Sequence, residues 1–325
     1  MIKQKNEFEI ISDFFSPLAR DKGSFGLSDD VAALSLEKDY EFIVSTDMLV
    51  SGVHFFSSDK PEDVASKCIR VNISDIISKG GIPKYYFLSI ALPKEIDDKW
   101  LRSFTKSLGI EQKNFDIFLM GGDTVSTSGP LIVNIVCIGV VKNNHLIRRN
   151  GARPGDDIYV TGEIGSAKIG LEICKKNITV NSNLENYFIK KYRLPKPKKQ
   201  LGPKLINIAT SSIDISDGLI SDLNHICLAS NVKAEINYYL LPITDYVSEL
   251  RIDENELKNI LLNGGDDYEI LFTANSENSS KIIDLSKSLK VDITKIGVIV
   301  DGEGIVVLNN ESEKMDLILD GYKHR

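Results

Sequence analysis

Short clusters that combine aspartate with glycine or serine recur along this chain, and most of them follow an apolar run. They are GLSDDVAAL (26–34), STD (45–47), NISD (72–75), GGDT (121–124), DISDG (214–218) and GGDDYE (264–269). Aspartate is rare in cores and common in turns, so one such cluster usually indicates a cap or an Asx-turn. Several converging carboxylates repel one another unless protons or cations neutralise them. The repetition therefore favours a fold that gathers polar strand ends around cations.

The runs between the clusters predict both strands and helices. β-branched residues predict strands over 130–141 and 293–300. The run 41–49 begins in the same way and then becomes polar, which predicts a strand that ends at Asp47. Residues 61–79 have helical spacing, with proline at the start and Gly80–Gly81 as the stop. Asn72 and Asp75 are three residues apart, so a helix places them on one face.

The second half begins with turn residues and a short strand. We expect a helix from about Ser166, and then a strand end, a tight turn and a helix across 212–230. That helix would turn Leu219, Leu223, Ile226 and Cys227 inward. A chain of 325 residues is long enough for two domains. We place their boundary around Asn150–Asp156.

Composition excludes several classes of protein. The chain is 42% hydrophobic and 26% charged, as globular proteins are, and its net charge of −7 argues against a nucleic-acid groove or an anionic-membrane surface. No apolar stretch could span a bilayer and the first residues do not resemble a signal peptide, so we expect a cytoplasmic protein. The four cysteines form no C-x-x-C pair and are expected to be reduced core residues: Cys68, Cys137, Cys174 and Cys227.

One stretch is strongly basic, KKYRLPKPKKQLGPK at 190–204. It could attract a phosphate group, or it could be a solvated connector. We favour the connector, because charge runs are usually exposed.

The aspartate clusters indicate a chemistry. Oxygen ligands without cysteine or histidine partners select magnesium or calcium, and magnesium typically binds a few carboxylates, waters and a substrate phosphate. Glycines in GGDT and ISDG would let the backbone approach a phosphate closely. The chain lacks both the G-x-x-x-x-G-K-[ST] loop and the H-R-D set of protein kinases. If it uses ATP, we expect phosphoryl transfer assisted by several magnesium ions.

Together the motifs resemble a known family. GLSDDVAAL, VSTDMLVSGVHF, KCIRVNISDIISKGGIP, LMGGDTV, RNGARPGDDIYVTGEIGSAKIGL, IDISDGLISDL, LNGGDDYEILF and GYKHR occur in the order and spacing of the thiamine-monophosphate kinases. That family is part of the aminoimidazole-ribonucleotide synthetase-like superfamily.

The resemblance implies an α+β fold of the α/β sandwich type with two domains. Residues 1–150 would form an N-terminal α/β domain that binds magnesium and ATP and pairs its sheet with that of a second subunit. Residues 151–325 would form a synthetase-like α+β domain. A homodimer is implied, with the site in the cleft between the domains.

The resemblance also implies an activity: direct transfer of the γ-phosphoryl group of the co-substrate ATP to thiamine monophosphate, giving thiamine diphosphate and ADP. Asp30, Asp75, Asp123 and Asp217 would be catalytic. Magnesium ions would be surrounded by Asp30, Ser45, Thr46, Asp47, Asp75, Asp123, Asp214 and Asp217. Gly122, Asp123, Arg149 and Ser216 would bind ATP, while His54, Asp266 and Tyr322 would line the thiamine phosphate pocket.

Several of these residues have ordinary alternatives. His54 could be a packed histidine, Arg149 competes with Arg148 and Arg153 for a phosphate, and a tyrosine such as Tyr322 often only packs. The family commonly has glutamate where this chain has Asp266, which shortens the side chain by one methylene.

Two other functions remain open. The chain could be a sister ATP-dependent synthetase of the same superfamily. It could also be a non-catalytic scaffold that only holds a divalent cation.

Overall fold

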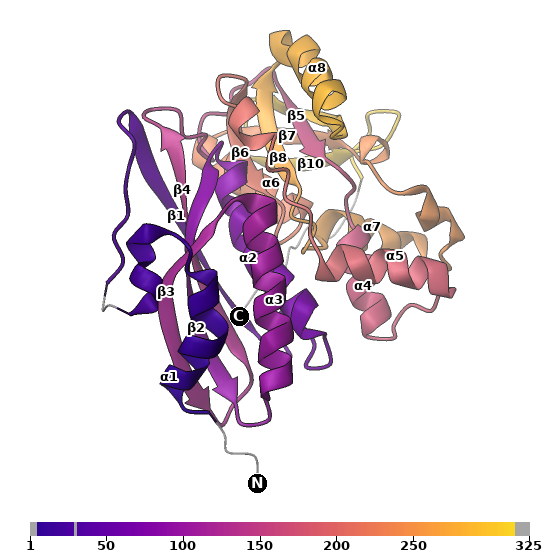
Figure 1. Cartoon of the computed structure of the whole chain (residues 1–325). Coiled ribbons are helices and arrows are strands. Elements are labelled where there is room, and N and C mark those ends of the chain that lie inside the picture. The colour runs from indigo at the N-terminus through magenta and orange to yellow at the C-terminus, as the bar shows by residue number, and fades with distance from the viewer. Residues whose placement is uncertain (1–4, 29–30, 316–325) are drawn as a thin grey trace. The chain divides into compact units, whose positions relative to one another are not determined.

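The computed structural model describes residues 5–28 and 31–315, which divide into two compact units. The first unit comprises the chain up to Ile76 together with Gly81–Asn144. The second comprises Ile77–Gly80 together with the chain from His145 onward. Each unit has its own sheet (Figure 1).

The first unit is a four-stranded sheet with helices beside it (Figure 1). The strands are β1 (Tyr40–Val50), β2 (Ile82–Pro93), β3 (Phe118–Thr127) and β4 (Ile132–Lys142). Their order is β1-β4-β2-β3; β4 is antiparallel to both β1 and β2, while β3 is parallel to β2. The helices are α1 (Glu7–Ile10), α2 (Pro61–Ser78) and α3 (Asp98–Phe115). A π-helical turn (Ile11–Phe15) and two 3₁₀ segments (Ser16–Leu18, Lys22–Leu27) follow α1.

Alternation along the strands gives this sheet two different faces. Leu88 and Ile90 of β2 and Ile135 of β4 are buried, whereas the residues between them are more exposed. Since successive side chains of a strand point to opposite faces, one face is packed and the other is open. In β1 the same alternation leaves Val44 and Met48 61% and 56% exposed.

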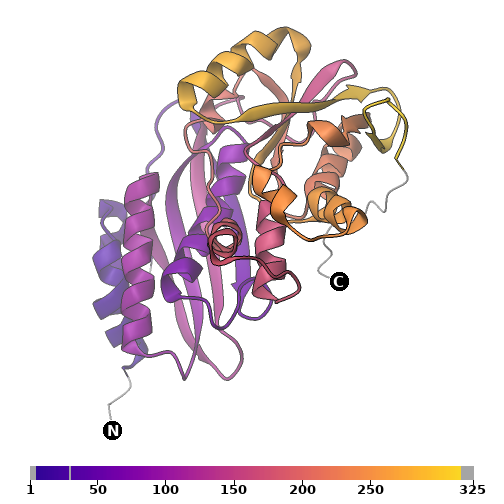
Figure 2. The same ribbon diagram turned by 90° about the vertical axis from the view of Figure 1, so that its right-hand side faces the viewer.

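The second unit has a six-stranded sheet in the order β10-β7-β9-β5-β8-β6. Its strands are β5 (Asp156–Thr161), β6 (Ala209–Asp214), β7 (Lys233–Asn237), β8 (Ile270–Asn275), β9 (Ile293–Val300) and β10 (Gly304–Leu308). Its helices are α4 (Ser166–Cys174), α5 (Ser182–Arg193), α6 (Leu219–Ser230), α7 (Glu254–Asn263) and α8 (Ser279–Leu289). Figure 2 shows α8, in yellow, lying along this sheet.

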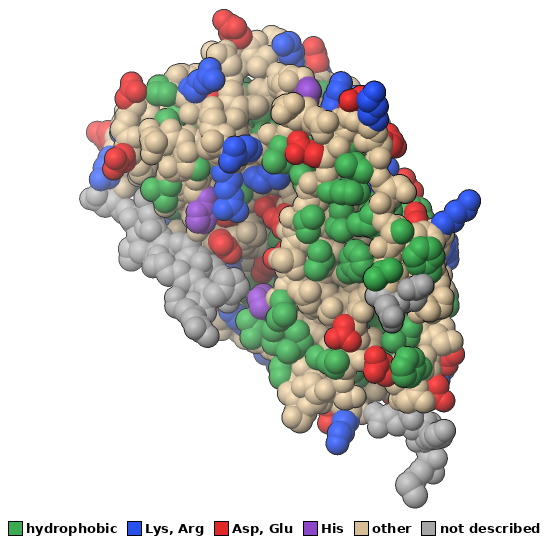
Figure 3. All heavy atoms as spheres, turned by 90° about the vertical axis from the view of Figure 1, so that its left-hand side faces the viewer, with side chains coloured by type: hydrophobic (Ala, Val, Ile, Leu, Met, Phe, Trp, Pro, Cys, Tyr) green, Lys and Arg blue, Asp and Glu red, His purple; other side chains and the backbone are tan. Residues whose placement is uncertain are grey.

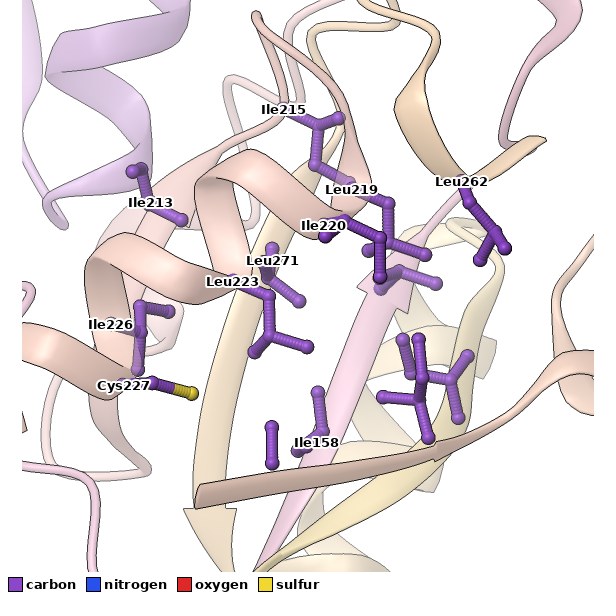
Figure 4. Packing of buried hydrophobic residues seen from close by; sticks show 14 of the residues in the cluster. Ile158, Ile213, Ile215, Leu219, Ile220, Leu223, Ile226, Cys227, Leu262 and Leu271 are labelled. Carbon is purple, nitrogen blue, oxygen red and sulfur yellow. The ribbon is translucent and has the colours of Figure 1, made fainter. Parts of the chain in front are cut away.

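The core of the second unit lies between α6 and the sheet. Leu219, Leu223 and Ile226 of α6 are fully buried and pack with Ile158 of β5 and Leu271 of β8 (Figure 4). The three α6 residues and Cys227 are the ones that the helical spacing predicts to point inward. The packing holds α6, and the turn that precedes it, in one position.

Where bounds were predicted for α2, β4 and β9, the structure agrees with them to within two residues, and α4 begins at Ser166 as expected. The position of Asp47 differs from the expectation, because β1 continues for three residues beyond it to Val50. The aspartate therefore lies within the strand, where alternation decides which way it points. Cys68, Cys137 and Cys227 are buried and free, as expected, whereas Cys174 is only partly buried.

The basic stretch 190–204 is not the solvated connector that we expected. Its Lys191 forms an ion pair with Glu163 at 2.9 Å, and Lys198 forms one with the buried Glu269 at 2.9 Å. Leu201 lies within the same stretch and is fully buried. The segment is thus anchored to the last residue of GGDDYE, directly before β8. Across residues 5–28 and 31–315, no helix combines the length and the apolarity needed to cross a bilayer.

Candidate active site

The STD and NISD motifs lie together in the first unit. The Ser45 hydroxyl of β1 donates a hydrogen bond to the Asp75 carboxylate of α2. The Asp47 backbone N–H donates to the side-chain oxygen of Asn72, at 3.0 Å. Ser45 and Asp47 are two apart on a strand, and Asn72 and Asp75 are three apart on a helix, so each pair shares a face. We call these four residues the STD–NISD cluster.

Buried neutral groups form the base of this cluster. Asn72 is fully buried, and its amide donates to the Cys68 carbonyl at 3.0 Å. Burial raises the pKa of the Cys68 thiol to about 12, and the nearby Asp47 charge adds to this rise. Burial likewise raises the pKa of Cys137 to about 12, with a further contribution from Asp75. The four residues of the cluster carry hydroxyl, amide and carboxylate groups, so the cluster offers only oxygen donors to a cation.

Thr46 and Asp123 lie on the other face of the sheet. Asp47 aligns with Ile135, Leu88 and Gly122 in one cross-strand row, whereas Asp123 belongs to the next row, which it shares with Met48, Asn134 and Ser89. Rows alternate between faces. The Thr46 hydroxyl accordingly contacts the side-chain oxygen of Asn134, at 3.2 Å.

Asp123 is also distant from Asp47 along the sheet. Three strand spacings separate β3 from β1, which is about 14 Å. The structure therefore does not bring the side chains of Thr46 and Asp123 together with Asp47 and Asp75 in one chain.

The GGDT motif borders a pocket of the first unit with a volume of about 680 Å³. Phe15, Leu27 and Val31 contribute apolar side chains from the N-terminal segment, and Gly122 and Asp123 contribute from β3. Apolar walls beside a few polar groups are typical of small-ligand pockets. Gly122 is required by packing, because a Cβ atom at this position would lie 1.7 Å from the Leu88 carbonyl oxygen.

In the second unit, the DISDG and GGDDYE motifs are joined through their backbones. The N–H of Asp266 donates to the Ser216 carbonyl at 2.9 Å, and the N–H of Tyr268 donates to the Ile215 carbonyl at 2.8 Å. Gly265 permits this approach, because a Cβ atom there would lie 2.3 Å from the Ser216 oxygen. The structure thus brings Ser216, Asp217 and Asp266 into neighbouring loops, and Asp214, the last residue of β6, directly precedes the first of them.

A buried carboxylate that the sequence reasoning missed lies behind the DISDG turn. Asp222 of α6 is 2% exposed and accepts hydrogen bonds from the N–H groups of Ser216 (3.0 Å) and Asp217 (3.1 Å). Burial, followed by the charge of Asp217, raises the pKa of Asp222 to about 7. The repeated serine–aspartate pair in ISDGLISD was the available signal. An acidic residue in a first helical turn is usually interpreted as a cap.

GGDDYE supplies two more buried carboxylates. Asp267 accepts the N–H groups of Gly165 (2.7 Å) and Ala167 (3.2 Å), at the start of α4, and burial raises its pKa to about 8. Glu269 accepts the Thr161 hydroxyl at 2.5 Å and the Lys198 ammonium at 2.9 Å. Burial raises the pKa of Glu269, while Lys198 opposes that rise.

The remaining predicted residues are placed as follows. His54, in the first unit, is partly buried, and its Nδ1 accepts the Val50 N–H at 3.0 Å. Arg149, in the second unit, is exposed, and its carbonyl accepts the Ser230 hydroxyl at 3.3 Å. Asp30 and Tyr322 lie outside the described residues.

Among the residues that the structure describes, no three His, Cys, Asp or Glu side chains are grouped so that they could hold a metal ion. Magnesium needs only one or two carboxylates when waters and substrate phosphates complete its shell. The oxygen-only STD–NISD cluster, with its two carboxylates, fits that requirement.

The fold and these motifs define a class. Residues 28–141 match the family model of the AIR synthase related protein, N-terminal domain, and residues 153–309 match that of the C-terminal domain. The chain therefore belongs to the AIR synthase related proteins, which agrees with the two-domain α+β fold class predicted from the sequence.

Individual relatives narrow the class. The chain is 39% identical over 323 residues to the thiamine-monophosphate kinase of Buchnera aphidicola subsp. Schizaphis graminum, with 98% of each chain covered. The crystal structure of thiamine-monophosphate kinase from Stenotrophomonas maltophilia K279a superposes with a TM-score of 0.83 at 33% identity, covering 92% of this chain and 94% of that one. A third structure, AaThiL complexed with AMPPCP and TMP, superposes with a TM-score of 0.78 at 27% identity over the whole of both chains.

This chain is thus a member of the thiamine-monophosphate kinase family, as its motifs indicated, and an enzyme of the phosphotransferase class.

Proposed function

We propose that this chain transfers the γ-phosphoryl group of ATP directly to the phosphate of thiamine monophosphate, giving thiamine diphosphate and ADP. The observation that carries the proposal is the STD–NISD cluster, in which Ser45 bonds to Asp75 and Asp47 bonds to Asn72. Within a chain of this family, that oxygen-only cluster suits a magnesium-dependent kinase.

The acceptor is already an ionised phosphate, so the reaction needs no strong general base and no covalent phosphoenzyme. The main difficulty is to hold two anions together. Asp47 and Asp75 of the first unit, and Asp214 and Asp217 of the second, would hold magnesium ions, and Asp30 is a further proposed ligand. When bound, the metal neutralises phosphate charge and aligns the attacking and leaving oxygens.

Other residues are proposed to bind the substrates. Gly122 and Asp123 border the apolar pocket of the first unit, which supports a role toward the nucleotide. Ser216 and Arg149 are proposed to contact ATP phosphates. His54, Asp266 and Tyr322 are proposed to contact thiamine monophosphate. A metal role for Thr46 would have to use its backbone, because its side chain points to the other face of the sheet from Asp47.

A homodimer is part of the proposal. The open face of the first sheet exposes Val44, Met48 and Val125 to 61%, 56% and 49%. Hydrophobic side chains gather on the side of the molecule shown in Figure 3. Contiguous apolar surface of this kind favours association. We further propose that the enzyme is cytoplasmic. Its N-terminal domain, residues 1–150, would bind magnesium and ATP and form the dimer, and residues 151–325 would form the synthetase-like domain.

Product detection tests the activity. Purified protein is mixed with ATP, magnesium and thiamine monophosphate, and a parallel tube receives an aminoimidazole-pathway substrate instead. Thiamine diphosphate and ADP in equal amounts are expected from the first tube. ATP consumed only in the second tube would indicate a sister synthetase. Cation binding that ATP does not strengthen, without turnover in either tube, would indicate a scaffold.

A further inference from the structure

The turn that carries Ser216 and Asp217 is held by a carboxylate to which the family resemblance assigns no role. We propose that Asp222 is a positioning residue: it fixes the backbone of this turn so that the side chains of Ser216 and Asp217 face their ligands. The identity of those ligands, an ATP phosphate and magnesium, rests on the proposed function.

The hydrogen bonds give Asp222 this role. A single oxygen, Oδ2, accepts the N–H groups of both Ser216 and Asp217, at 3.0 and 3.1 Å. Both bonds use only main-chain atoms of the turn, so neither occupies the Ser216 hydroxyl or the Asp217 carboxylate. Two N–H groups that converge on one acceptor restrict the orientation of the peptide unit between them.

The backbone of GGDDYE also holds the turn. The Ser216 carbonyl accepts the Asp266 N–H at 2.9 Å. Gly218 has a φ of 119°, and a Cβ atom there would lie 2.7 Å from the backbone carbonyl of Asn263. Neighbouring backbone therefore confines the turn at Ser216 and Gly218, and the Asp222 side chain adds a further restraint at the N–H groups of Ser216 and Asp217.

Asp222 is itself held rigidly. It lies in the first turn of α6, and Leu219, Leu223 and Ile226 of that helix are fully buried in the core shown in Figure 4. A group fixed on a packed helix positions a loop more accurately than one on another loop does.

The test compares two substitutions with a matched control in the full chain. Asp222→Ala removes the acceptor, whereas Asp222→Asn keeps an acceptor oxygen of the same reach. The control is Asp156→Ala. Asp156 is 3% exposed and also accepts a backbone N–H, that of Arg153 at 3.0 Å, together with the Thr210 hydroxyl at 2.7 Å. It contacts neither Ser216 nor Asp217 through these bonds.

Two readouts are needed, and one of them does not depend on activity. In Asp222→Ala, hydrogen exchange of the peptide covering 213–221 should be roughly tenfold faster or more. Its kcat should fall about tenfold or more, and the magnesium concentration for half-maximal rate should rise. Asp222→Asn should recover most of the kcat. Asp156→Ala should lower the melting temperature without either effect.

The proposal is overturned if Asp222→Ala leaves peptide exchange, kcat and magnesium requirement as they are in the unsubstituted chain. It is also overturned if exchange accelerates while kcat is unchanged, or if Asp156→Ala lowers kcat equally. Failure of the unsubstituted chain to make thiamine diphosphate would remove the proposed function instead. Hydrogen exchange, measured with magnesium and ATP present and absent, would then still decide whether Asp222 orders the turn around these ligands.

Discussion

Asp75 lies half-buried where α2 meets β1, and its carboxylate accepts the hydroxyl of Ser45. Asparagine at this position could still accept that bond, so Asp75→Asn removes charge while keeping the packing. We expect kcat to fall about 100-fold or more, because the cation that stabilises the charge of the transition state would lose a carboxylate ligand. The melting temperature should change little. Steady-state kinetics and thermal unfolding measure the two quantities.

Asp116→Asn is the control for Asp75→Asn. Asp116 is exposed in the same unit and adopts a left-handed backbone conformation that asparagine tolerates. It should leave both kcat and melting temperature unchanged. A fully active Asp75→Asn enzyme would contradict the magnesium assignment.

The role of the His54 Nε2 atom can be tested separately from that of Nδ1. Its Nδ1 accepts the Val50 N–H, and an asparagine side chain can replace that acceptor but has no atom at the position of Nε2. We expect His54→Asn to fold normally and to raise the KM for thiamine monophosphate roughly tenfold, the equivalent of one hydrogen bond. The KM for ATP serves as the internal control, and an equal rise in both constants would count against a pocket role.

Asp267 predicts a dependence of stability on pH. Burial raises its folded-state pKa to about 8, against about 3.9 in an unfolded chain. Between these values the folded protein keeps a proton that the unfolded chain has released. The free energy of unfolding should therefore fall as pH rises from about 4 to about 8. Urea unfolding at several pH values gives the free energy of unfolding at each pH. This free energy should fall less steeply with pH in Asp267→Asn than in the unsubstituted chain, whereas the exposed Asp301→Asn should show no such reduction.

Among the elements, β1 shows most clearly what a sequence pattern predicts and where it stops. β-branched residues predicted the start of the strand to within one residue, and helical spacing predicted that Asn72 and Asp75 share a face of α2. The pattern did not reveal that Asp47 lies within the strand. It also did not reveal that the side chains of Thr46 and Asp123 lie on the face of the sheet opposite to that of Asp47. Which face a residue occupies depends on the register with neighbouring strands, and register is not local.

Partners far apart in the chain were likewise invisible to the sequence. Lys198 appeared to belong to a solvated charge run, yet its partner Glu269 follows 71 residues later. Asp222 is close in sequence to Ser216, but its bonds depend on the backbone conformation of the turn. Family resemblance supplied the candidate ligands, whereas the groups that hold them in place required the structure.

Gly122 provides a prediction at the scale of two strands. A Cβ atom would meet the backbone of β2 at Leu88, which cannot move aside as a flexible side chain could. Gly122→Ala should lower the free energy of unfolding by about 3 kcal/mol. Gly129→Ala, near the β3–β4 turn and with only a hydroxyl at 3.4 Å, should cost far less. Urea denaturation compares them, and equal stabilities would contradict the close approach.

At the scale of the whole molecule, the open face of the first sheet predicts the proposed dimer. Aspartate at both Val44 and Met48 would place charge on that apolar surface. We expect the double substitution to give a folded monomer, because buried unpaired charge opposes association. Sedimentation velocity measures the mass and circular dichroism checks the fold.

Ile110→Asp is the matched control for the dimer. Ile110 is 49% exposed on α3, away from the open face of the sheet, and its substitution should leave the dimer intact. A dimer that persists in the double variant would place the interface elsewhere.

The alternation along β1 also limits how relatives of this chain can diverge. Ser45 and Asp47 point to one side, and Val44, Thr46 and Met48 to the other. An insertion or deletion of one residue within the strand would exchange the two sets at once. Relatives of this chain can therefore differ in the length of the loops on either side of β1, but the length of the strand itself must stay the same. A change in that length would alter both faces of the strand together.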